Sequence, residues 1–323
     1  MNIDIGIKGR IRAVVSKSNG EVCSDTGEFD NLILNQGLDV LGGIANKGNN
    51  LYDKCVIGTG TSIPNENQTS LDTYVSSASV SNNYNAVTKI DAEKNIVIVS
   101  RMFIYKFENI GNYNLTEIGL ASTGFNESNV HMCTRTLFKD SSGESTTISL
   151  QADETLSIYY TIYAVYSTLD RTGTINLLDG NGGSTPYNYL VRLSGVSTTN
   201  TYWGNGMVGT GLTSSNVGCT SYSSGAVAFT EIPVTKTHTI YDGGFKTSAY
   251  GYLPGSYTRT YSCSAAVGKN TGLVKTMYVG SPFSNWQIEY SKVSDGSGIT
   301  VTSSDKISTT FTFNWGRYDG EID

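Results

Sequence analysis

The sequence contains little of what enzymes, metal centres and secreted domains are usually built from. Its 323 residues include only two histidines, five cysteines and five prolines. His131 and His238 have no readable nucleophile or acid partner nearby, so neither is expected to be catalytic. The cysteines are odd in number, widely spaced and never arranged as CxxC, which predicts neither a disulfide framework nor a zinc site; they are Cys23, Cys55, Cys133, Cys219 and Cys263. The sequence therefore predicts no enzyme, no cofactor and no metal, and synthesis in a reducing cytoplasm.

Positive charge and long apolar runs are also scarce. The formal net charge is −6, and the longest cluster of basic residues is Lys8 to Arg12, so nucleic-acid binding is not expected. No apolar run approaches the roughly 20 residues that a membrane-spanning helix needs, and the first fifteen residues alternate instead of forming an apolar block. Neither membrane insertion nor a classical export signal is predicted. The 36 glycines follow no three-residue period, which excludes a collagen-like stalk.

What the sequence does contain is the patterning of β-strands. Apolar residues alternate from Ile3 to Val15 and again from Leu156 to Tyr166, which places them on one face of a strand. A nearly continuous apolar run from Ile96 to Phe107 predicts a central strand that is buried on both faces. Short strands separated by turns about every ten residues are typical of β-sandwiches and jelly rolls. The predicted fold class is all-β.

One short helix and two domains complete the predicted organisation. Leucines recur at intervals of three and four between Asn31 and Asn46, with Asn31 and Asn35 as candidate caps. After Tyr166 the composition shifts towards Ser, Thr, Gly and Tyr, and a cluster of turn-forming residues follows at Asp179 to Ser184. We therefore expect two β-sandwich or jelly-roll-like domains, an N-terminal one over residues 1–168 that holds the helix and a C-terminal one over residues 169–323.

Three glycines are predicted to be structural. Gly58 and Gly60 flank a threonine at the end of an apolar strand, and Gly119 lies in the apolar segment around Glu117. Such positions suit a tight turn or a close approach of the backbone, for which a residue without a Cβ is needed. Glu117 is expected either to accept hydrogen bonds from a neighbouring turn or to face the solvent.

Aromatic residues in the second half supply the candidate contact sites. The chain has 21 tyrosines, whose broad ring and polar tip suit interfaces. Trp203, Tyr250, Tyr252 and Tyr257 are candidates for contact with another subunit or with a glycan, whereas Trp286 is expected to be buried in the core.

Four segments of the first half stand in an order that is known from other proteins. They are Phe29-Asp30-Asn31-Leu32 running into Asn35-Gln36-Gly37-Leu38-Asp39, Val56-Ile57-Gly58-Thr59-Gly60-Thr61, Leu115-Thr116-Glu117-Ile118-Gly119-Leu120 and Asp153-Glu154-Thr155-Leu156-Ser157-Ile158. In these segments the chain resembles a family of bacteriophage tail, baseplate and collar structural proteins. The resemblance implies a β-rich domain that anchors the chain to other virion proteins, assembly in the cytoplasm of the host bacterium, and a homo-oligomer located in the virion.

Two other functions remain open from the sequence. The second half could make the chain a tail-fibre protein that binds a host receptor or surface glycan through its aromatic residues. A polysaccharide depolymerase would need only two carboxylates about 5–10 Å apart, which a sequence cannot reveal. The sequence shows none of the short repeats of the solenoids that such enzymes commonly form.

Overall fold

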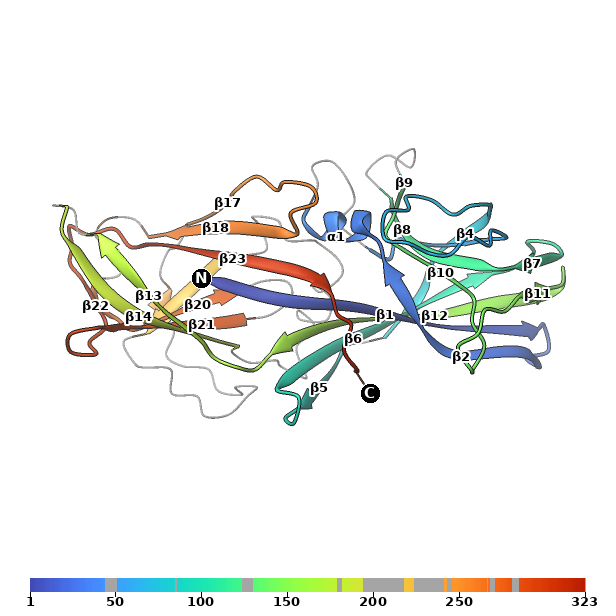
Figure 1. Ribbon diagram of the computed structural model, residues 1–323, viewed down its shortest axis with the longest axis horizontal. Helices are drawn as coiled ribbons and strands as arrows, with labels where there is room; N and C mark the ends of the chain where they lie inside the picture. Colours follow the sequence, from blue (N-terminus) through green and yellow to red (C-terminus); the bar gives the residue numbers. More distant parts are fainter. Residues whose placement is uncertain are drawn as a thin grey trace.

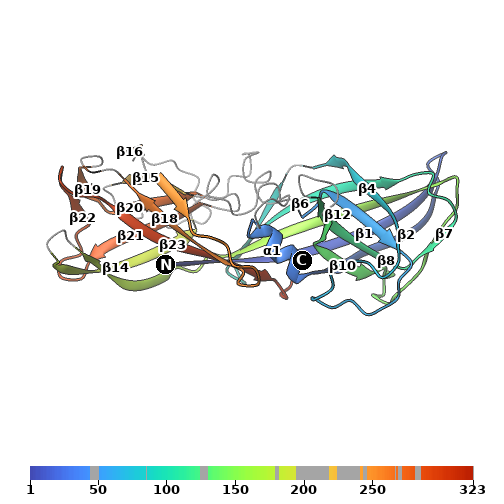
Figure 2. The same cartoon turned by 90° about the horizontal axis from the view of Figure 1, so that it is seen from above.

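Strands make up nearly all the regular structure, as the sequence predicts. The computed structural model describes residues 1–43, 51–84, 86–123, 130–178, 182–193, 218–223, 241–242, 246–265, 267, 271–280 and 285–322. Within these ranges one helix is present, α1 (Asn35–Leu41). The all-β class with a single short helix is confirmed. The molecule is elongated, with the first half of the chain at one end and most of the second half at the other (Figures 1 and 2).

Eight strands of the first half close into a barrel. In spatial order they are β1 (Asn2–Lys17), β12 (Glu154–Ser167), β6 (Ile96–Phe107), β4 (Tyr74–Asn83), β3 (Lys54–Gly58), β8 (Glu117–Thr123), β10 (Thr134–Leu137) and β2 (Val22–Ile33). Four short strands flank the barrel: β5 (Val87–Asp91), β7 (Tyr113–Leu115), β9 (Val130–Met132) and β11 (Ile148–Leu150).

Closure of this barrel differs from the two-layer sandwich expected for residues 1–168. The cause is β1, which pairs antiparallel with β2 on one side and with β12 on the other. A strand that is paired on both sides joins the two ends of the sheet, so the sheet curls into a cylinder instead of forming two facing layers. The alternating pattern of β1 and β12 fits either arrangement, because one face of each strand is buried in both.

The barrel interior is filled by side chains. Large residues on the inward faces of the strands are fully or almost fully buried, among them Phe103, Tyr105, Phe107, Ile158 and Tyr160. Eight strands enclose a space just wide enough for side chains to fill. The interior of the barrel is therefore a hydrophobic core.

The strand β1 also belongs to the sheet of the second half. Its residues Asn2 to Ile7 pair in parallel with β23 (Ser308–Arg317), while Gly6 to Lys17 pair with β12. In Figure 1 this strand runs along the molecule from the C-terminal half into the barrel. The predicted division at residue 168 stays a prediction, but the first residues of the chain lie in the same sheet as its last strand.

Two sheets face each other in the second half. One continues from β1 through β23 and β18 (Thr258–Ser264) to β17 (Lys246–Ala249). The other has the order β13 (Arg171–Leu178), β14 (Ser184–Leu193), β21 (Asn285–Lys292), β20 (Thr276–Gly280), β15 (Gly218–Ser223) and β16 (Tyr241–Asp242). A separate pair is formed by β19 (Gly272–Val274) and β22 (Ile299–Val301). Trp286 and Ile288 from one sheet and Phe311 and Phe313 from the other belong to the same buried cluster, so the expected burial of Trp286 is confirmed.

The helix is shorter than the sequence predicts. Asn31 lies in β2, and the N-cap position is taken by Leu34, which makes no side-chain capping bond. The helix ends at Leu41 with Gly42 as its C-cap, and residues 44–46 of the predicted helix lie outside the described ranges. The leucine spacing identified the buried face correctly, since Leu38 and Leu41 are each 1% exposed.

Gly9 provides a test of barrel packing. A Cβ on this residue would lie 2.1 Å from the Tyr160 hydroxyl oxygen. Gly9→Ala is therefore expected to lower the free energy of unfolding by about 1–3 kcal/mol, as overpacking of a core does. The loss should be smaller in a Tyr160→Phe background, where that oxygen is absent. Urea unfolding would measure all four combinations.

A matched control is Gly316→Ala in β23, where an added Cβ meets no atom within 4 Å. This substitution is expected to change stability by less than about 0.5 kcal/mol. Equal losses for Gly9→Ala and Gly316→Ala would contradict the packing argument.

Candidate functional site

The segment that joins β17 to β18 packs against helix α1. One carboxylate oxygen of Asp39, Oδ1, accepts hydrogen bonds from the Tyr252 hydroxyl at 2.6 Å and from the Gly255 backbone N–H at 2.7 Å. The ring of Tyr252 also lies 5.6 Å from that of Trp315 in β23. Burial, followed by the hydrogen bond to the Asp39 carboxylate, raises the pKa of Tyr252, so the hydroxyl keeps its proton and remains a donor.

The end of β23 holds the same helix and the strand before it. The indole N–H of Trp315 donates to the Leu38 carbonyl at 2.8 Å, and the Arg317 guanidinium donates to the Ile33 carbonyl at 2.6 Å. From β18, Arg259 donates to the Gly42 carbonyl at 2.8 Å. The Leu38 carbonyl also accepts the Gly42 N–H within the helix, whereas the Gly42 carbonyl at the helix C-terminus has no helical partner and is satisfied by Arg259. We call this set of contacts around α1 the junction.

The predicted contact residues lie in different environments. Tyr252 is a junction residue, and Tyr257 is partly buried with a positive φ of 49°. Tyr250 is 56% exposed. Trp203 lies outside the described residues. For Tyr252 the interface suggested by the sequence is therefore one within the chain.

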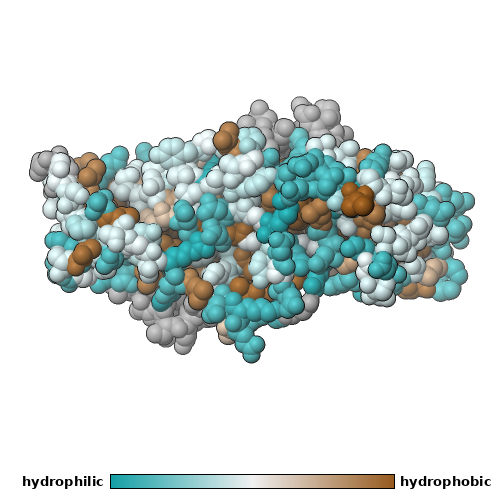
Figure 3. Space-filling model, in the orientation of Figure 1, coloured by the Kyte–Doolittle hydropathy of each residue, from teal (hydrophilic) through white to brown (hydrophobic). Residues whose placement is uncertain are grey.

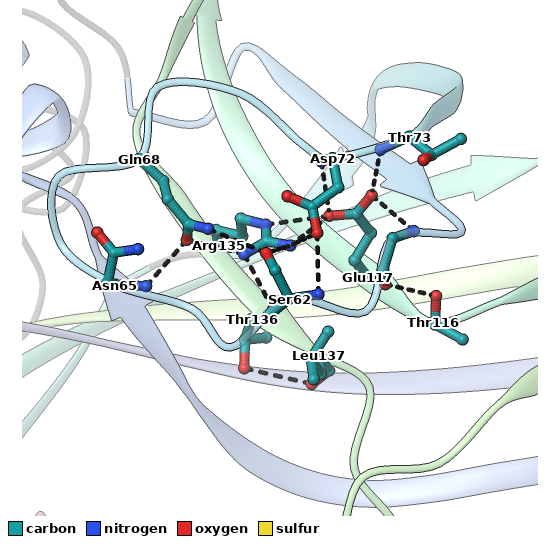
Figure 4. A network of polar contacts seen from close by, with 11 residues as sticks. Ser62, Asn65, Gln68, Asp72, Thr73, Thr116, Glu117, Arg135, Thr136 and Leu137 are labelled. Atoms are coloured by element: carbon teal, nitrogen blue, oxygen red, sulfur yellow. Dashed lines mark hydrogen bonds and ion pairs between the residues drawn. The ribbon is translucent and has the colours of Figure 1, made fainter.

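A second group of polar side chains holds the loop between β3 and β4 to the barrel wall (Figure 4). Glu117, at the start of β8, is fully buried. Its carboxylate accepts backbone N–H groups from Gly60 at 2.9 Å, from Thr73 at 2.8 Å and from Asp72 at 3.1 Å. Of the two alternatives that the sequence left open, the structure shows that Glu117 accepts hydrogen bonds from a turn.

The charge of Glu117 is balanced by Arg135 from the neighbouring strand β10. Two guanidinium nitrogens of Arg135 lie 3.0 and 2.8 Å from the same oxygen of Glu117, and one of them is also 2.8 Å from Asp72. A third nitrogen donates to Gln68 at 2.8 Å. Both Glu117 and Arg135 are 0% exposed. A buried charge pair is tolerated only when its remaining hydrogen-bonding groups are also satisfied, and here the loop supplies those groups. We call Glu117, Arg135 and Asp72 the clamp.

The Asp72 carboxylate is held in its charged form. Hydrogen bonds from the Ser62 hydroxyl and backbone N–H, together with the positive charge of Arg135, lower the pKa of Asp72. Both clamp carboxylates therefore accept hydrogen bonds from Arg135 and from backbone N–H groups of the loop.

Two of the three predicted structural glycines lie beside the clamp. An added Cβ would approach the Thr73 carbonyl oxygen to 2.4 Å at Gly58, and a carboxylate oxygen of Glu117 to 2.4 Å at Gly60. Gly119 lies within β8 and not in a turn, and a Cβ there would lie 2.1 Å from the Thr134 carbonyl oxygen. The requirement for glycine is real at all three positions, but at Gly119 it comes from a close approach between two strands.

Sequence reasoning missed Arg135. The available signal was a single charged residue within the otherwise uncharged stretch from Val130 to Phe138. Such a residue in a strand of a buried sheet needs a partner of opposite charge. The sequence does not show that this partner is Glu117, since the contact depends on the pairing of β10 with β8.

The clamp is suited to holding structure and not to acid–base chemistry. Glu117 and Asp72 are the closely placed carboxylates that a depolymerase would require, but the donors described above already occupy them. A general acid or base must reach its substrate, which the fully buried Glu117 cannot do, while the partly exposed Asp72 carboxylate is held by Arg135 and by the Ser62 N–H.

Other reactive groups are also buried or already in contact with neighbours. His131 of β9 has its Nδ1 2.6 Å from Gln36 Nε2. Burial raises the pKa of the thiols of Cys55 and Cys133, which keeps them protonated and unreactive. Among the residues that the structure describes, no three or more His, Cys, Asp or Glu side chains lie close enough together to hold a metal ion.

A surface hollow of about 530 Å³ lies where β2 and β10 diverge. These two strands pair only at Ile33 with Thr134 and at Leu32 with Arg135. Three cations line the hollow, and two of them are paired within the chain, Lys8 with Asp30 at 3.1 Å and Arg317 with Glu66 at 2.8 Å; the third is Lys139. The charges of Lys8 and Arg317 are therefore compensated within the chain and do not by themselves select a ligand.

Comparison of the chain with protein-family models, with curated proteins and with solved structures gave no match. No helix in the described ranges is both long enough and apolar enough to cross a membrane.

Removal of the clamp arginine is expected to be costly. Arg135→Met leaves the buried Glu117 charge uncompensated and should lower the free energy of unfolding by about 3–5 kcal/mol. Adding Glu117→Leu should not restore stability, because the N–H groups of Gly60, Asp72 and Thr73 then lose their acceptor. Urea unfolding of the single and double variants measures both effects.

The control for the clamp is Arg12→Met, which breaks the exposed ion pair between Arg12 and Asp25. An exposed pair contributes about 0–1 kcal/mol. If Arg135→Met were no more harmful than Arg12→Met, the clamp would not stabilise the fold as described.

Tyr252→Phe tests the junction separately. The substitution keeps the ring beside Trp315 but removes the hydroxyl that donates to Asp39, and we expect a loss of about 1–2 kcal/mol in unfolding free energy. Tyr250→Phe is the control, because that side chain is mostly exposed. In an Asp39→Ala background the effect of Tyr252→Phe should largely disappear, and persistence of the full loss would show that Asp39 is not its cause.

Proposed function

We propose that this chain is a structural subunit of a bacteriophage virion, in the tail, baseplate or collar, that works by oligomeric assembly. Its partners would be copies of itself and neighbouring virion proteins. Assembly would occur in the cytoplasm of the host bacterium, and the mature location would be the virion. The proposal gives the chain no catalytic group, no cofactor and no nucleic-acid contact.

The observation that carries the proposal is the membership of β1 in both halves of the molecule. Its sixteen residues are hydrogen-bonded to β2 and β12 in the barrel and to β23 in the second half. A pull on one half reaches the other through backbone ladders, because a continuous strand crosses between them. Such a connection suits a subunit that must keep its shape under load in a larger particle.

The residues that carry the phage resemblance are also those that hold the fold together. Two of the segments contain Gly58, Gly60 and Glu117 of the clamp region, and another contains Asp39 of the junction. The pattern is thus explained by structural roles and requires no catalytic role. This agrees with a family whose members share a framework for assembly.

The arrangement of the two sheets in the second half belongs to the same proposal. We infer that its two facing sheets form a β-sandwich that projects from the barrel, and that the barrel anchors the subunit. Support comes from the shared core of the two sheets, in which the Tyr166 ring of β12 also lies 6.4 Å from that of Trp286.

Binding of a host receptor or glycan is the second candidate function. The observation in its favour is the exposed pair Tyr250 and Leu253, which are 56% and 71% exposed on the segment between β17 and β18. Against it, Tyr252 is already engaged by Asp39. A glycan array probed with the purified chain and with Tyr250→Ala would detect such binding, and signal lost in the variant would favour the receptor function.

Immunogold electron microscopy tests the structural proposal. Antibodies raised against the purified chain are expected to label purified phage particles at fixed positions on the tail, baseplate or collar. Particles without label, with the chain found only in the soluble part of the lysate, would overturn the proposal.

A further inference from the structure

Within the described part of the chain, β13 forms an open edge of the six-stranded sheet in the second half. It pairs with β14 along its whole length, from Arg171 with Val191 to Leu178 with Ser184, without a bulge. Between Thr172 and Leu178 it contains neither a charged residue nor a proline. Natural proteins usually protect an exposed edge with one of these features, because its free N–H and C=O groups can pair with another strand.

The other edges in the described part of the chain are shorter or carry charge. On the far side of the same sheet, β16 has two residues, and β17 ends the facing sheet with four residues that include Lys246. Beside the barrel, β5 has five residues, of which Lys89 and Asp91 are charged. Among these strands β13 is the longest, and its one charged residue, Arg171, stands at its first position and is paired with Asp4.

The face of the molecule shown in Figure 3 offers less to a partner than this edge does. On the face shown in Figure 3, hydrophobic side chains form small groups scattered among hydrophilic ones. Association through that face would bury little continuous apolar surface. Pairing through a sheet edge needs no such surface, because backbone hydrogen bonds supply the affinity.

We propose that β13 pairs antiparallel with β13 of a second copy of this chain, about a two-fold axis through Ile175. The proposal rests on the function proposed above and names the first contact of its assembly. The two six-stranded sheets would join into one continuous sheet. This register places Thr172 opposite Leu178 of the partner, Gly173 opposite Leu177 and Thr174 opposite Asn176.

The register is supported by a match between a projecting side chain and a hollow. Leu178 is 80% exposed, on the same face of the sheet as Thr172 and Thr174. On that face a hollow of about 440 Å³ is lined by Thr172, Thr174, Leu190 and neighbouring residues. With Leu178 of the partner opposite Thr172, its side chain would lie beside the hollow, and the two-fold axis would repeat the contact at the other end.

A second copy fits this edge without a charge conflict. Antiparallel pairing of one strand with itself sets each residue opposite a residue of the same segment, and between Thr172 and Leu178 none of them is charged. In a two-fold interface both subunits use the same surface, so a strand that can pair with a copy of itself needs no other partner.

Two oppositely charged variants test the register directly. In T174K/N176K each lysine faces a lysine of the partner, and in T174D/N176D each aspartate faces an aspartate. Like charges directly opposite each other destabilise a strand pair, so each variant alone should dimerise at least about tenfold more weakly than the unmodified chain. Mixed in equal amounts, they should form a heterodimer, since every lysine then faces an aspartate. Sedimentation velocity of the full chain measures the masses.

The mixture also serves as the control for folding. Both variants lose the same hydrogen bond from Thr174 to Asn188, at 3.0 Å, so a difference between the separate and mixed samples cannot come from that loss. A further control, V87K/I90K on β5, places two lysines on another exposed edge strand and is expected to leave the dimer intact.

The outcomes separate this inference from the proposed function. A monomer at concentrations up to about 100 µM, or a dimer that T174K/N176K does not weaken, would overturn the β13 interface. Neither result would remove label from virions. Label absent from virions would overturn the proposed function even if the β13 dimer formed, and a dimer restored by mixing would support the interface.

Discussion

The backbone pairing of β1 is the constraint on which the rest of the structure depends. Every N–H and C=O of a buried strand needs a partner, and β1 finds them in three other strands. Its alternation buries Ile3 and Ile5 in the second half and Ile11, Ala13 and Val15 in the barrel. A shift of one residue would turn all of these side chains to the opposite face. One register thus sets the packing of the core in both halves of the molecule.

The sequence revealed the strands but not their partners. The period of two in β1 and β12, and the apolar run of β6, depend on local burial, which a sequence records directly. Closure into a barrel depends on which strands meet across large sequence separations, and the same alternation serves a sandwich equally well. The helix was predicted too long because Asn31 looks like a cap, whereas its backbone is held in β2 by pairing with Gly9.

The candidate sites show the same division. For Glu117 the sequence left a hydrogen-bond acceptor and a solvent-facing side chain as alternatives, and Arg135 was missed because the contact between them depends on the pairing of two strands. Tyr252 was expected at an interface, and the structure places it between segments of one chain, against a helix more than two hundred residues earlier. The predicted contact of Tyr252 with a subunit or glycan stays a prediction, and in both cases the partner within the chain could be found only from the fold.

The parallel pairing of β1 with β23 also determines when folding can finish. Ile3 pairs with Phe313, so the first part of β1 has no partner in that sheet until the ribosome has released nearly the whole length of chain between them. During synthesis the barrel strands emerge first, and the buried face of Ile3 and Ile5 stays in water. Contacts between residues so far apart form slowly. The nascent chain therefore exposes the apolar face of this strand until β23 has been synthesised. A chaperone that covers this face would raise the yield of folded protein.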